Sequence, residues 1–487
     1  MLEHLKSEFN KTQTDNGAFA YKSTKSKVLD LFSQGGAYRS RSDRDIISLF
    51  SEAFSEDKLL SMRTLFHIRN VRGGMGERRF FRTVLDYLSK VDEEVLRKNL
   101  HLIPKFGRWD DLWLLLDTDL KDDVVDLVDK QLREDMNFDT VSLLAKWMPS
   151  LKSRNENTRR YAYILRTSLK MSPRKYRKLL SHLRSKIGIV ETHITDGEFN
   201  KIEYDKIPSR AGMIYRNAFF RNDEKRYRAF LNSLEKGEVK VNAGTLYPND
   251  IVGKILGNAW WHTPKHSTQD IKLFEGQWNN LPDFIGENKE NSMVMADVSA
   301  SMTGTPMNVA ISLAMYIAER NKGSFHNHFM TFSSRPELVE ISGDNIVDKV
   351  NNIKDSNWGH STNIESALMT ILNVGISNNV PSENMISKLY IISDMQFDMC
   401  SSGADKHIFE TVRQYYEDAG YNMPQIVFWN VNARTTNTPF TMNDDGVALV
   451  SGYSPSILTH LLGDKHYNPY EIMLSVVNSD MYRDVVV

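Results

Sequence analysis

Three oxygen-bearing side chains stand at alternate positions in the C-terminal part of this 487-residue chain: Asp297, Ser299 and Ser301. They follow a short apolar run, and one carboxylate with two hydroxyls on a tight loop offers the hard ligands that Mg²⁺ prefers. Two more oxygen side chains, Thr362 and Asp394, stand near the ends of other predicted elements. The sequence therefore predicts that these five side chains bind Mg²⁺ or another divalent cation.

The elements that must position these ligands alternate between two kinds. Short apolar runs typical of strands occupy residues 293–297, 327–332, 388–393 and 425–430. Amphipathic segments typical of helices occupy residues 307–320, 344–354, 363–372 and 409–419. This alternation predicts a parallel sheet with helices on both faces, in which a ligand binds at the carboxyl ends of the strands.

Two other interpretations of the Asp-x-Ser-x-Ser run stay open. Asp297 could be an ordinary turn or helix-capping residue. It could also be the nucleophile of an aspartyl-phosphate enzyme, in which the carboxylate likewise ends a first strand. Such enzymes need a second Asp two residues later, and that position is Ser299 here.

The net charge of −1 hides a strong asymmetry between two parts of the chain. Residues 291–487 contain 11 basic and 21 acidic side chains, whereas residues 1–290 contain 50 and 41. A basic part and an acidic part suggest different partners.

The basic charge is densest between residues 151 and 186, where Glu156 is the one acidic residue. Interleaved aromatic residues such as Tyr161 and Tyr163 offer faces on which unpaired bases could stack. We therefore predict an RNA-binding surface here; pairing of these cations with the acidic C-terminal part is the alternative. The candidate RNA-binding residues are Lys152, Arg154, Arg159, Arg160, Arg166, Lys170, Arg174, Lys175, Arg177, Lys178, His182 and Arg184.

Apolar residues recur at helical spacing through most of residues 25–290, with almost no strand-like alternation. Successive amphipathic helices joined by short polar segments favour an all-α array of the HEAT-repeat type. The sequence thus divides into an N-terminal extension (1–24), a helical repeat module (25–290) and an α/β, Rossmann-like domain (291–487).

Other motifs have weaker chemical meaning. His262 and His266 are separated by Pro264 and lack an intervening Glu, so their pattern does not match a zinc-binding helix. The run Arg72-Gly-Gly-Met-Gly lacks the Lys-Ser/Thr ending of a phosphate-binding loop and is better explained as a turn between helices. No arrangement near the basic segment is typical of a nuclease, so we expect no enzymatic activity.

Localisation signals point to the cytoplasm. The single cysteine, Cys400, excludes an intrachain disulfide framework and fits a reducing compartment. The sequence contains no apolar run long enough for a transmembrane helix, and its first residues do not resemble a secretory signal. We therefore expect a cytoplasmic protein.

The metal-ligand pattern resembles the metal-ion-dependent adhesion site of von Willebrand factor A domains, and the order of strands and helices that follows is also similar. One departure is Ala300, which stands where this family often has Gly and supplies no ligand. The resemblance implies that the C-terminal domain is a von Willebrand factor A domain.

Three N-terminal stretches resemble the helical module of TROVE proteins such as the Ro autoantigen. They begin at Arg72, His101 and Leu144, and the stretch that begins at Val241 is typical of a related Ro-like family of plant, giant-virus and phage proteins. The resemblance implies a ring of helical repeats closed by the von Willebrand factor A domain, and a ribonucleoprotein that binds small non-coding or single-stranded RNA without catalysis. The alternative is an assembly scaffold, viral or chaperone-like, whose metal grips a carboxylate of a partner protein.

Overall fold

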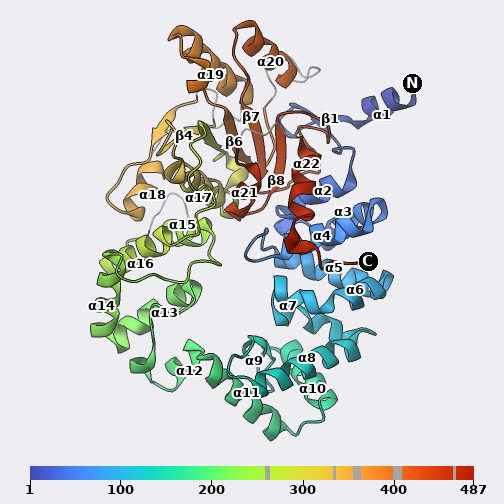
Figure 1. Ribbon diagram of the computed structural model, residues 1–487, viewed down its shortest axis with the longest axis vertical. Helices are drawn as coiled ribbons and strands as arrows, with labels where there is room; N and C mark the ends of the chain where they lie inside the picture. Colours follow the sequence, from blue (N-terminus) through green and yellow to red (C-terminus); the bar gives the residue numbers. More distant parts are fainter. Residues whose placement is uncertain (258–263, 333–335, 355–362, 399–407, 464–467) are drawn as a thin grey trace.

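The chain forms an arc of helices and a three-layer sheet domain (Figure 1). The structure, a computed structural model, describes residues 1–487 except 258–263, 333–335, 355–362, 399–407 and 464–467. Thr362, His262 and Cys400 lie outside the described residues.

The first limb of the arc descends from the sheet domain to the far end of the molecule (Figure 1). Its helices are α2 (Lys27–Gly35), α3 (Asp43–Glu56), α4 (Lys58–Arg69), α5 (Arg78–Val91), α6 (Glu93–Asn99), α7 (Ile103–Phe106), α8 (Lys121–Asn137), α9 (Leu144–Trp147), α10 (Glu156–Ser168) and α11 (Pro173–Ile187). The second limb returns to the sheet domain through α12 (Val190–Thr195), α13 (Ser209–Asn222), α14 (Glu224–Glu235), α15 (Pro248–Leu256) and α16 (Thr268–Asn279).

Local sequence signals account for many of these helix boundaries, and α11 is an example. The side chain of Ser172 accepts a hydrogen bond from the Lys175 amide, and Pro173 occupies the first turn, where its missing N–H costs nothing. Gly188 ends the helix in the left-handed conformation, with φ of 68°. Tyr176, Leu180 and Leu183 recur on one face of the helix and are buried.

The helical spacing of apolar residues within 25–290 predicts helices at 110–116 and 140–147, but both segments take a different form. Residues 110–116 form the 3₁₀ helices η3 (Trp109–Asp111) and η4 (Trp113–Asp117), and within 140–147 only α9 is helical. Asp111 accepts a hydrogen bond from the Arg108 amide and is fully buried against two arginines, which favours the tighter turn. The arc is therefore less regular than a series of equal helix pairs.

The sheet domain has six strands in the order β5-β4-β3-β6-β7-β8, all parallel except β5. The strands are β3 (Ser292–Ala296), β4 (His328–Thr331), β5 (Leu338–Glu340), β6 (Lys388–Ser393), β7 (Gln425–Asn430) and β8 (Val447–Ser451). The four predicted strands are present, and the sequence analysis missed β5 and β8.

Helices cover both faces of this sheet. Side chains alternate along the strands, so Val294 and Ala296 enter one core cluster and Met293 and Met295 enter another. The first cluster includes residues of α17 (Thr305–Arg320), α18 (Ile346–Lys354), α21 (Leu458–Leu461) and α22 (Pro469–Val477), together with the helices of the first limb. The second cluster includes residues of α19 (Ile364–Ser377) and α20 (Ile408–Asp418).

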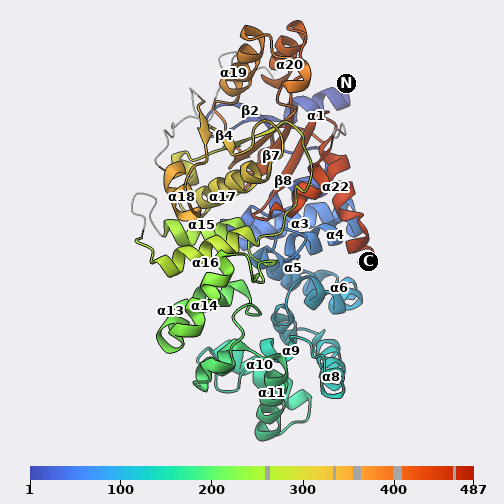
Figure 2. The ribbon, with the colours of Figure 1, turned by 60° about the vertical axis from the view of Figure 1, so that its left-hand side comes forward.

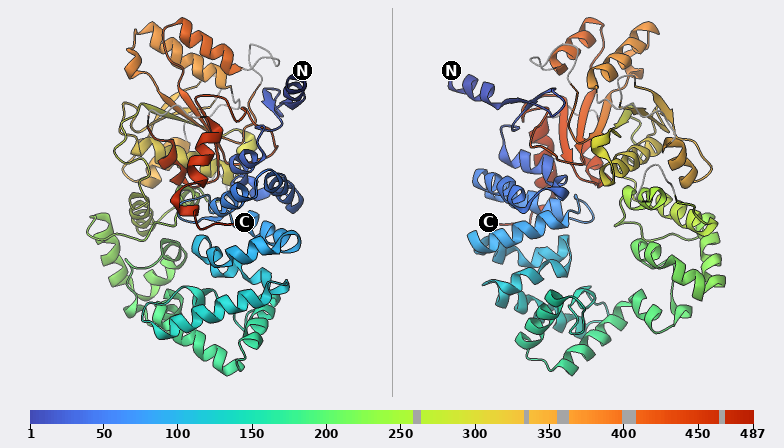
Figure 3. Two further views of the ribbon diagram at one scale, coloured as in Figure 1. Left: turned by 45° about the vertical axis from the view of Figure 1, so that its right-hand side comes forward. Right: turned by 180° about the vertical axis from the view of Figure 1, so that it is seen from behind.

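Both limbs of the arc rest on the sheet domain, as the views in Figure 3 agree. On one side α2 contacts β8 and α22, and on the other α15 contacts α17 while α16 contacts α18. Each end of the chain crosses to the other module. The N-terminal helix α1 (Leu2–Asn10) and the hairpin of β1 (Lys11–Gln13) and β2 (Phe19–Tyr21) lie at the sheet domain (Figure 2), and the C-terminal 3₁₀ helix η9 (Asp480–Tyr482) contacts α4.

None of the helices in the described ranges is long and apolar enough to cross a membrane.

Candidate cation site and basic surface

Two of the predicted metal ligands follow adjacent strands at the point where the strand order reverses. Asp297 follows β3 and Asp394 follows β6, and β3 and β6 pair in parallel, with Ala296 opposite Ile392. The Asp297 amide continues this pairing by donating to the Ile392 carbonyl at 2.9 Å. Because the connections leave β3 and β6 in opposite directions along the sheet, a crevice is expected at their carboxyl ends.

Asp297 is fully buried and held by two donors. Its Oδ1 accepts a bond from the Ser299 amide at 2.9 Å, and its Oδ2 accepts one from the Ser393 hydroxyl at 2.7 Å. Burial raises the pKa of Asp297 to about 6, and the charge of Asp394 adds to this effect, whereas these hydrogen bonds oppose it. The bond from the Ser299 amide is the turn contact that the capping interpretation expects.

Asp394 has an unsatisfied oxygen. Its Oδ1 accepts a bond from the Gln396 amide at 3.2 Å, but its Oδ2 is buried and has no hydrogen-bond partner in the described part of the protein. Burial raises the pKa of this carboxyl group, and the hydroxyl of Ser301 acts in the opposite direction. A buried oxygen without a partner costs free energy unless a ligand, water or ion satisfies it.

The two serines of the run lie beside these carboxylates. The hydroxyls of Ser299 and Ser301 are 3.0 Å apart, and Ser299 is nearly buried. The structure thus brings together Asp297, Ser299, Ser301 and Asp394, while Thr362 lies outside the described residues. Among the described residues the site contains two carboxylates, and no group of three or more His, Cys, Asp or Glu side chains suited to a metal occurs in this part of the chain. Any cation here would need hydroxyl and water ligands, which Mg²⁺ accepts.

The sequence analysis missed Ser393 and Gln396, which both contact the carboxylates. Ser393 ends β6 and directly precedes Asp394, so its strand position was a usable signal. Gln396 has no such signal, because its contact with Asp394 depends on the turn that follows β6.

The predicted RNA-binding residues occupy α10, α11 and the segments before them. Most are exposed on the side of α11 opposite its buried residues Tyr176, Leu180 and Leu183, or in the adjoining turns. Within the described chain, the side chains of eight of them make no ion pair or hydrogen bond. We call these eight the basic surface: Lys152, Arg154, Lys170, Arg174, Lys175, Arg177, Lys178 and His182.

The other four candidate RNA-binding residues are engaged within the arc. Arg159 donates to backbone carbonyls of Ser153 and Arg154, and Arg166 donates to the Met171 carbonyl. Arg160 pairs with Asp117, with a shortest N–O distance of 2.6 Å.

Arg184 is the most buried of these four. It donates to the carbonyls of Ala145 and Met148 at 2.8 and 2.9 Å, and burial lowers the pKa of its guanidinium. We therefore leave Arg184 out of the basic surface.

The acidic sheet domain does not neutralise the basic surface. Helices α10 and α11 lie at the end of the molecule opposite the sheet, as Figures 1 and 2 both show. The ion pair recorded for this region, between Arg160 and Asp117, lies within the arc itself. Pairing with the acidic C-terminal part, the alternative interpretation of the sequence, is therefore wrong for the described residues.

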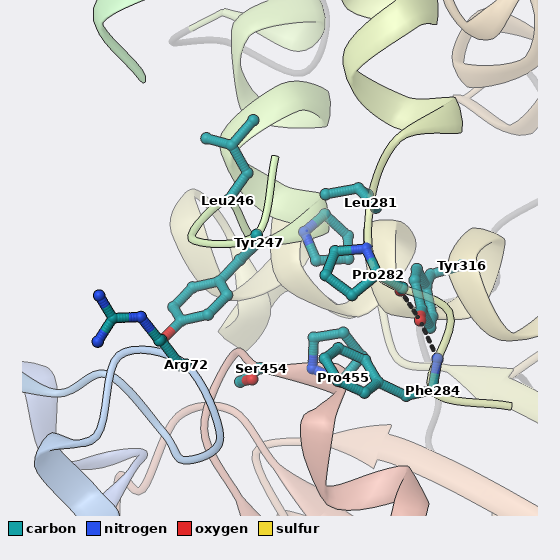
Figure 4. Close-up of a pocket in the computed structure, with 11 residues that line it drawn as sticks. Arg72, Leu246, Tyr247, Leu281, Pro282, Phe284, Tyr316, Ser454 and Pro455 are labelled. Carbon is teal, nitrogen blue, oxygen red and sulfur yellow. Dashed lines mark hydrogen bonds between the residues drawn. The ribbon is translucent and has the colours of Figure 1, made fainter. Parts of the chain in front are cut away.

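The glycine-rich run that begins at Arg72 is a turn between α4 and α5, as predicted. A side chain at Gly76, where φ is 66°, would collide with the Tyr247 hydroxyl, and one at Gly74 would collide with the His67 carbonyl. In a neighbouring pocket, Tyr247 lies between Arg72 and the prolines Pro282 and Pro455 (Figure 4). Its cavity volume of about 10 Å³ leaves room for at most one water molecule and none for a phosphate group, so the run is a packing element.

Two further sequence predictions concern single residues. His266 lies 2.9 Å from the Ile255 carbonyl through Nε2, a contact that positions the chain within the arc. Their apolar surroundings predict that Trp109, Trp113 and Trp147 are core residues; Trp109 and Trp113 are buried, whereas Trp147 is half-buried, with the guanidinium of Arg108 4.1 Å from the centre of its ring.

The chain is similar in sequence, along nearly its whole length, to an uncharacterised protein. It is 30% identical to "Uncharacterized protein L728" of Acanthamoeba polyphaga mimivirus over 98% of this chain and 89% of the viral protein. The crystal structure of the Ro (RSR) protein of Deinococcus radiodurans is similar over 93% of both chains, at 13% identity and a TM-score of 0.34, which is too distant to assign a function.

Two families match the two modules of the chain. Residues 291–483 match the family described as "Domain of unknown function (DUF7788)". Residues 14–134 and 153–289, more than half of the chain, match the family described as "Domain of unknown function (DUF2828)". With the giant-virus protein as a relative along nearly its whole length, the chain belongs to the DUF2828 family.

Proposed function

We propose that this protein binds RNA through the basic surface, formed by α11 and the turns that flank α10, and acts as a binding protein rather than an enzyme. The observation that carries the proposal is the set of unpaired cations on that surface. Like charges held together without counter-charges repel one another, and a polyanion relieves the repulsion while releasing its own condensed counterions. An ordinary solvent-exposed surface has acidic residues interspersed among its basic ones.

An exposed aromatic ring favours RNA over other polyanions. Tyr163 on α10 is 61% exposed, and the guanidinium of Arg166 lies 5.0 Å from the centre of its ring. Cations interleaved with an exposed ring are typical of surfaces on which unpaired bases stack while the phosphates are neutralised. The Ro-like motifs of the sequence support the same ligand class.

The test is a titration with single-stranded and hairpin RNA at several salt concentrations. Reversal of Arg174, Arg177 and Lys178 to Glu should weaken binding by about 100-fold or more at about 0.1 M salt and lower the salt dependence, because three phosphate contacts are lost. The control reverses Arg221, Lys225 and Lys240, three exposed cations of the second limb, and changes the net charge equally. Equal losses in both variants would contradict a localised site, and RNA cut during incubation with Mg²⁺ would contradict a purely binding role.

We also propose that Asp297, Ser299, Ser301 and Asp394 hold a divalent cation, with Mg²⁺ the best match to their oxygens. The unpartnered Oδ2 of Asp394 supports this, because a cation would satisfy it and offset the repulsion between two buried carboxylates. Bound there, the ion would supply a positive charge with open ligand positions.

Calorimetric titration with Mg²⁺ or Mn²⁺ tests the cation proposal. Asp297→Asn keeps the shape of the side chain but removes its charge, so it should lower the affinity at least about tenfold. Asp348→Asn, on the exposed side of α18, is the control. Equal affinities of wild type and Asp297→Asn would refute the site.

A further inference from the structure

We propose that the N-terminal hairpin of β1 and β2 is a positioning element for the candidate cation site, and that Gln396 transmits its effect to Asp394. The inference rests on the proposed cation site. It concerns residues 395–398, here called the β6 loop, which follow Asp394 and are nearly all buried.

The turn of the hairpin pairs with the β6 loop much as an added strand would. Thr14 Oγ1 donates to the Phe397 carbonyl at 2.7 Å, and Asn16 Nδ2 donates to the Gln396 carbonyl at 2.8 Å. Gly17 and Asp398 form an antiparallel bridge, and Ala18 is buried in the sheet-domain core. These contacts join parts of the chain about 380 residues apart, so local sequence alone does not determine the shape of the β6 loop.

Gln396 connects the hairpin directly to a candidate ligand. Its side-chain Oε1 accepts a bond from the Asp15 amide at 2.9 Å, and its Nε2 donates to Thr435 Oγ1 at 2.8 Å. Its own amide donates to Asp394 Oδ1 at 3.2 Å. One buried residue therefore links the hairpin, the connection between β7 and β8, and the carboxylate.

The neighbouring residue reaches the other carboxylate. The Met395 amide donates to the Ser393 hydroxyl at 3.1 Å, and that hydroxyl donates to Asp297 Oδ2. The position of the β6 loop thus affects both Asp297 and Asp394, in the way that outer contacts orient metal ligands.

The β6 loop needs such support because its backbone is strained. Met395 has φ of 64°, in the left-handed region that a side chain of this size rarely adopts, and it is 5% exposed. Strained backbone persists where surrounding contacts hold it. The hairpin provides them: its other side pairs with Thr438 through two backbone bonds, from the Tyr21 amide at 2.8 Å and to the Tyr21 carbonyl at 2.9 Å.

The hairpin in turn depends on the sheet domain for its own stability. Each of its strands has three residues, and an isolated two-stranded hairpin is marginal in water. Hairpin and β6 loop therefore order each other, and loosening the hairpin should release the loop without unfolding the sheet.

The experiment compares two double variants of the full chain. Thr14→Val with Asn16→Ala removes the two side-chain bonds to the β6 loop. Thr12→Val with Gln13→Ala makes the same kinds of change one step along the hairpin, where neither side chain bonds to the loop. The readouts are Mg²⁺ affinity by calorimetry and hydrogen exchange of amides 395–398, with thermal unfolding as a check on the fold.

We expect the Thr14/Asn16 variant to lose roughly 10-fold in Mg²⁺ affinity, as loss of outer contacts to metal ligands does elsewhere, and to exchange faster in the β6 loop. Gln396→Ala keeps the bond from its amide to Asp394 but removes the side-chain bonds to Asp15 and Thr435. It should therefore reproduce both effects. The Thr12/Gln13 variant should behave as wild type.

The outcomes separate this inference from the cation proposal. If wild type binds Mg²⁺ and the Thr14/Asn16 variant binds it equally well, the positioning role is wrong and the cation site stands. If wild type and Asp297→Asn fail alike to bind Mg²⁺, the cation site is wrong; unchanged loop exchange in the Thr14/Asn16 variant would then overturn the positioning role as well.

Discussion

Two arginine-rich regions of the helical arc use positive charge in opposite ways. Near the turn between α4 and α5, Arg69, Arg78 and Arg108 surround Asp110 and Asp111. The side chain of Arg69 is 2% exposed and donates twice to Asp111 Oδ2, at 2.8 and 2.7 Å. On α11 and the turns that flank α10, the cations of the basic surface are exposed and have no such partners among the described residues.

The difference separates charge that stabilises the fold from charge that is available to a ligand. Burial alone would raise the pKa of Asp111, yet the charges of Arg69 and Arg78 lower it below its ordinary value. Gly107 lies against Arg69, and a side chain there would collide with the guanidinium. Two of the stretches that resemble the TROVE module, those that begin at Arg72 and His101, therefore meet in a packed ion-pair network, whereas the unpaired cations lie elsewhere.

The largest effect should come from breaking the buried network. Asp111→Ala leaves Arg69 buried without a counter-charge, so we expect the free energy of unfolding to fall by about 3–5 kcal/mol. Denaturant titration measures this. Asp43→Ala is the control, because Asp43 is 67% exposed, and loss of its ion pair with Arg79 should cost about 1 kcal/mol or less. Equal costs would show that the network is no more important than a surface pair.

Acid should lower the free energy of unfolding through the buried His67, at pH values where all arginines and lysines keep their charge. His67 is buried beside Phe32 and Tyr482, and burial, with the nearby His460, lowers its pKa to about 3. Between pH 6.5 and 3 the unfolded chain binds a proton at this residue that the folded chain excludes. Stability is therefore fully present above pH 6.5 and falls below it, by roughly 3 kcal/mol at pH 4 from this group.

The measurement for His67 is the unfolding free energy as a function of pH. His67→Gln should flatten the curve between pH 6.5 and 4. A slope that persists in His67→Gln would assign the acid sensitivity to other groups.

Features that depend on local sequence patterns could be predicted from the sequence. Apolar runs located β3, β4, β6 and β7, and their order placed Asp297 and Asp394 at one edge of the sheet. The three-residue strand β5 is too short for its alternation to be recognised. The strands β1 and β2 are equally short, and contacts with residues about 380 positions later hold their hairpin in place, so the sequence analysis described this segment only as an extension.

The candidate RNA-binding residues show the same limit on the scale of side chains. Arg177 and Arg184 lie on the same helix, and charge density along the sequence does not distinguish them. Arg184 turns toward carbonyls at the end of α9, a packing relation that no spacing within α11 reveals. Charge density could locate the segment but could not separate its free cations from its structural ones.

That separation gives the next prediction, within α11 itself. Arg184→Met removes two hydrogen bonds from a charged group and should cost about 1–3 kcal/mol of unfolding free energy with little change in RNA affinity. Arg177→Met should do the reverse, weakening RNA binding by about threefold at unchanged stability. Denaturant and RNA titrations of both variants give the comparison. If Arg184→Met lost more RNA affinity than Arg177→Met, the division of the helix into structural and free cations would be wrong.

The smallest effect should come from converting a paired cation into a free one. Arg160 on α10 pairs with Asp117, and both side chains are partly exposed, at 51% and 34%. Asp117→Ala should cost at most about 1 kcal/mol of stability while raising RNA affinity roughly twofold, because one more guanidinium becomes available to phosphate. Asp43→Ala frees Arg79 far from this surface, and an equal gain there would show that net charge alone sets the affinity. In an Arg160→Ala background the gain from Asp117→Ala should vanish, since the two residues act as one pair. A gain that survived would mean that Asp117 repels RNA directly, and Arg160 would then contribute nothing to the basic surface.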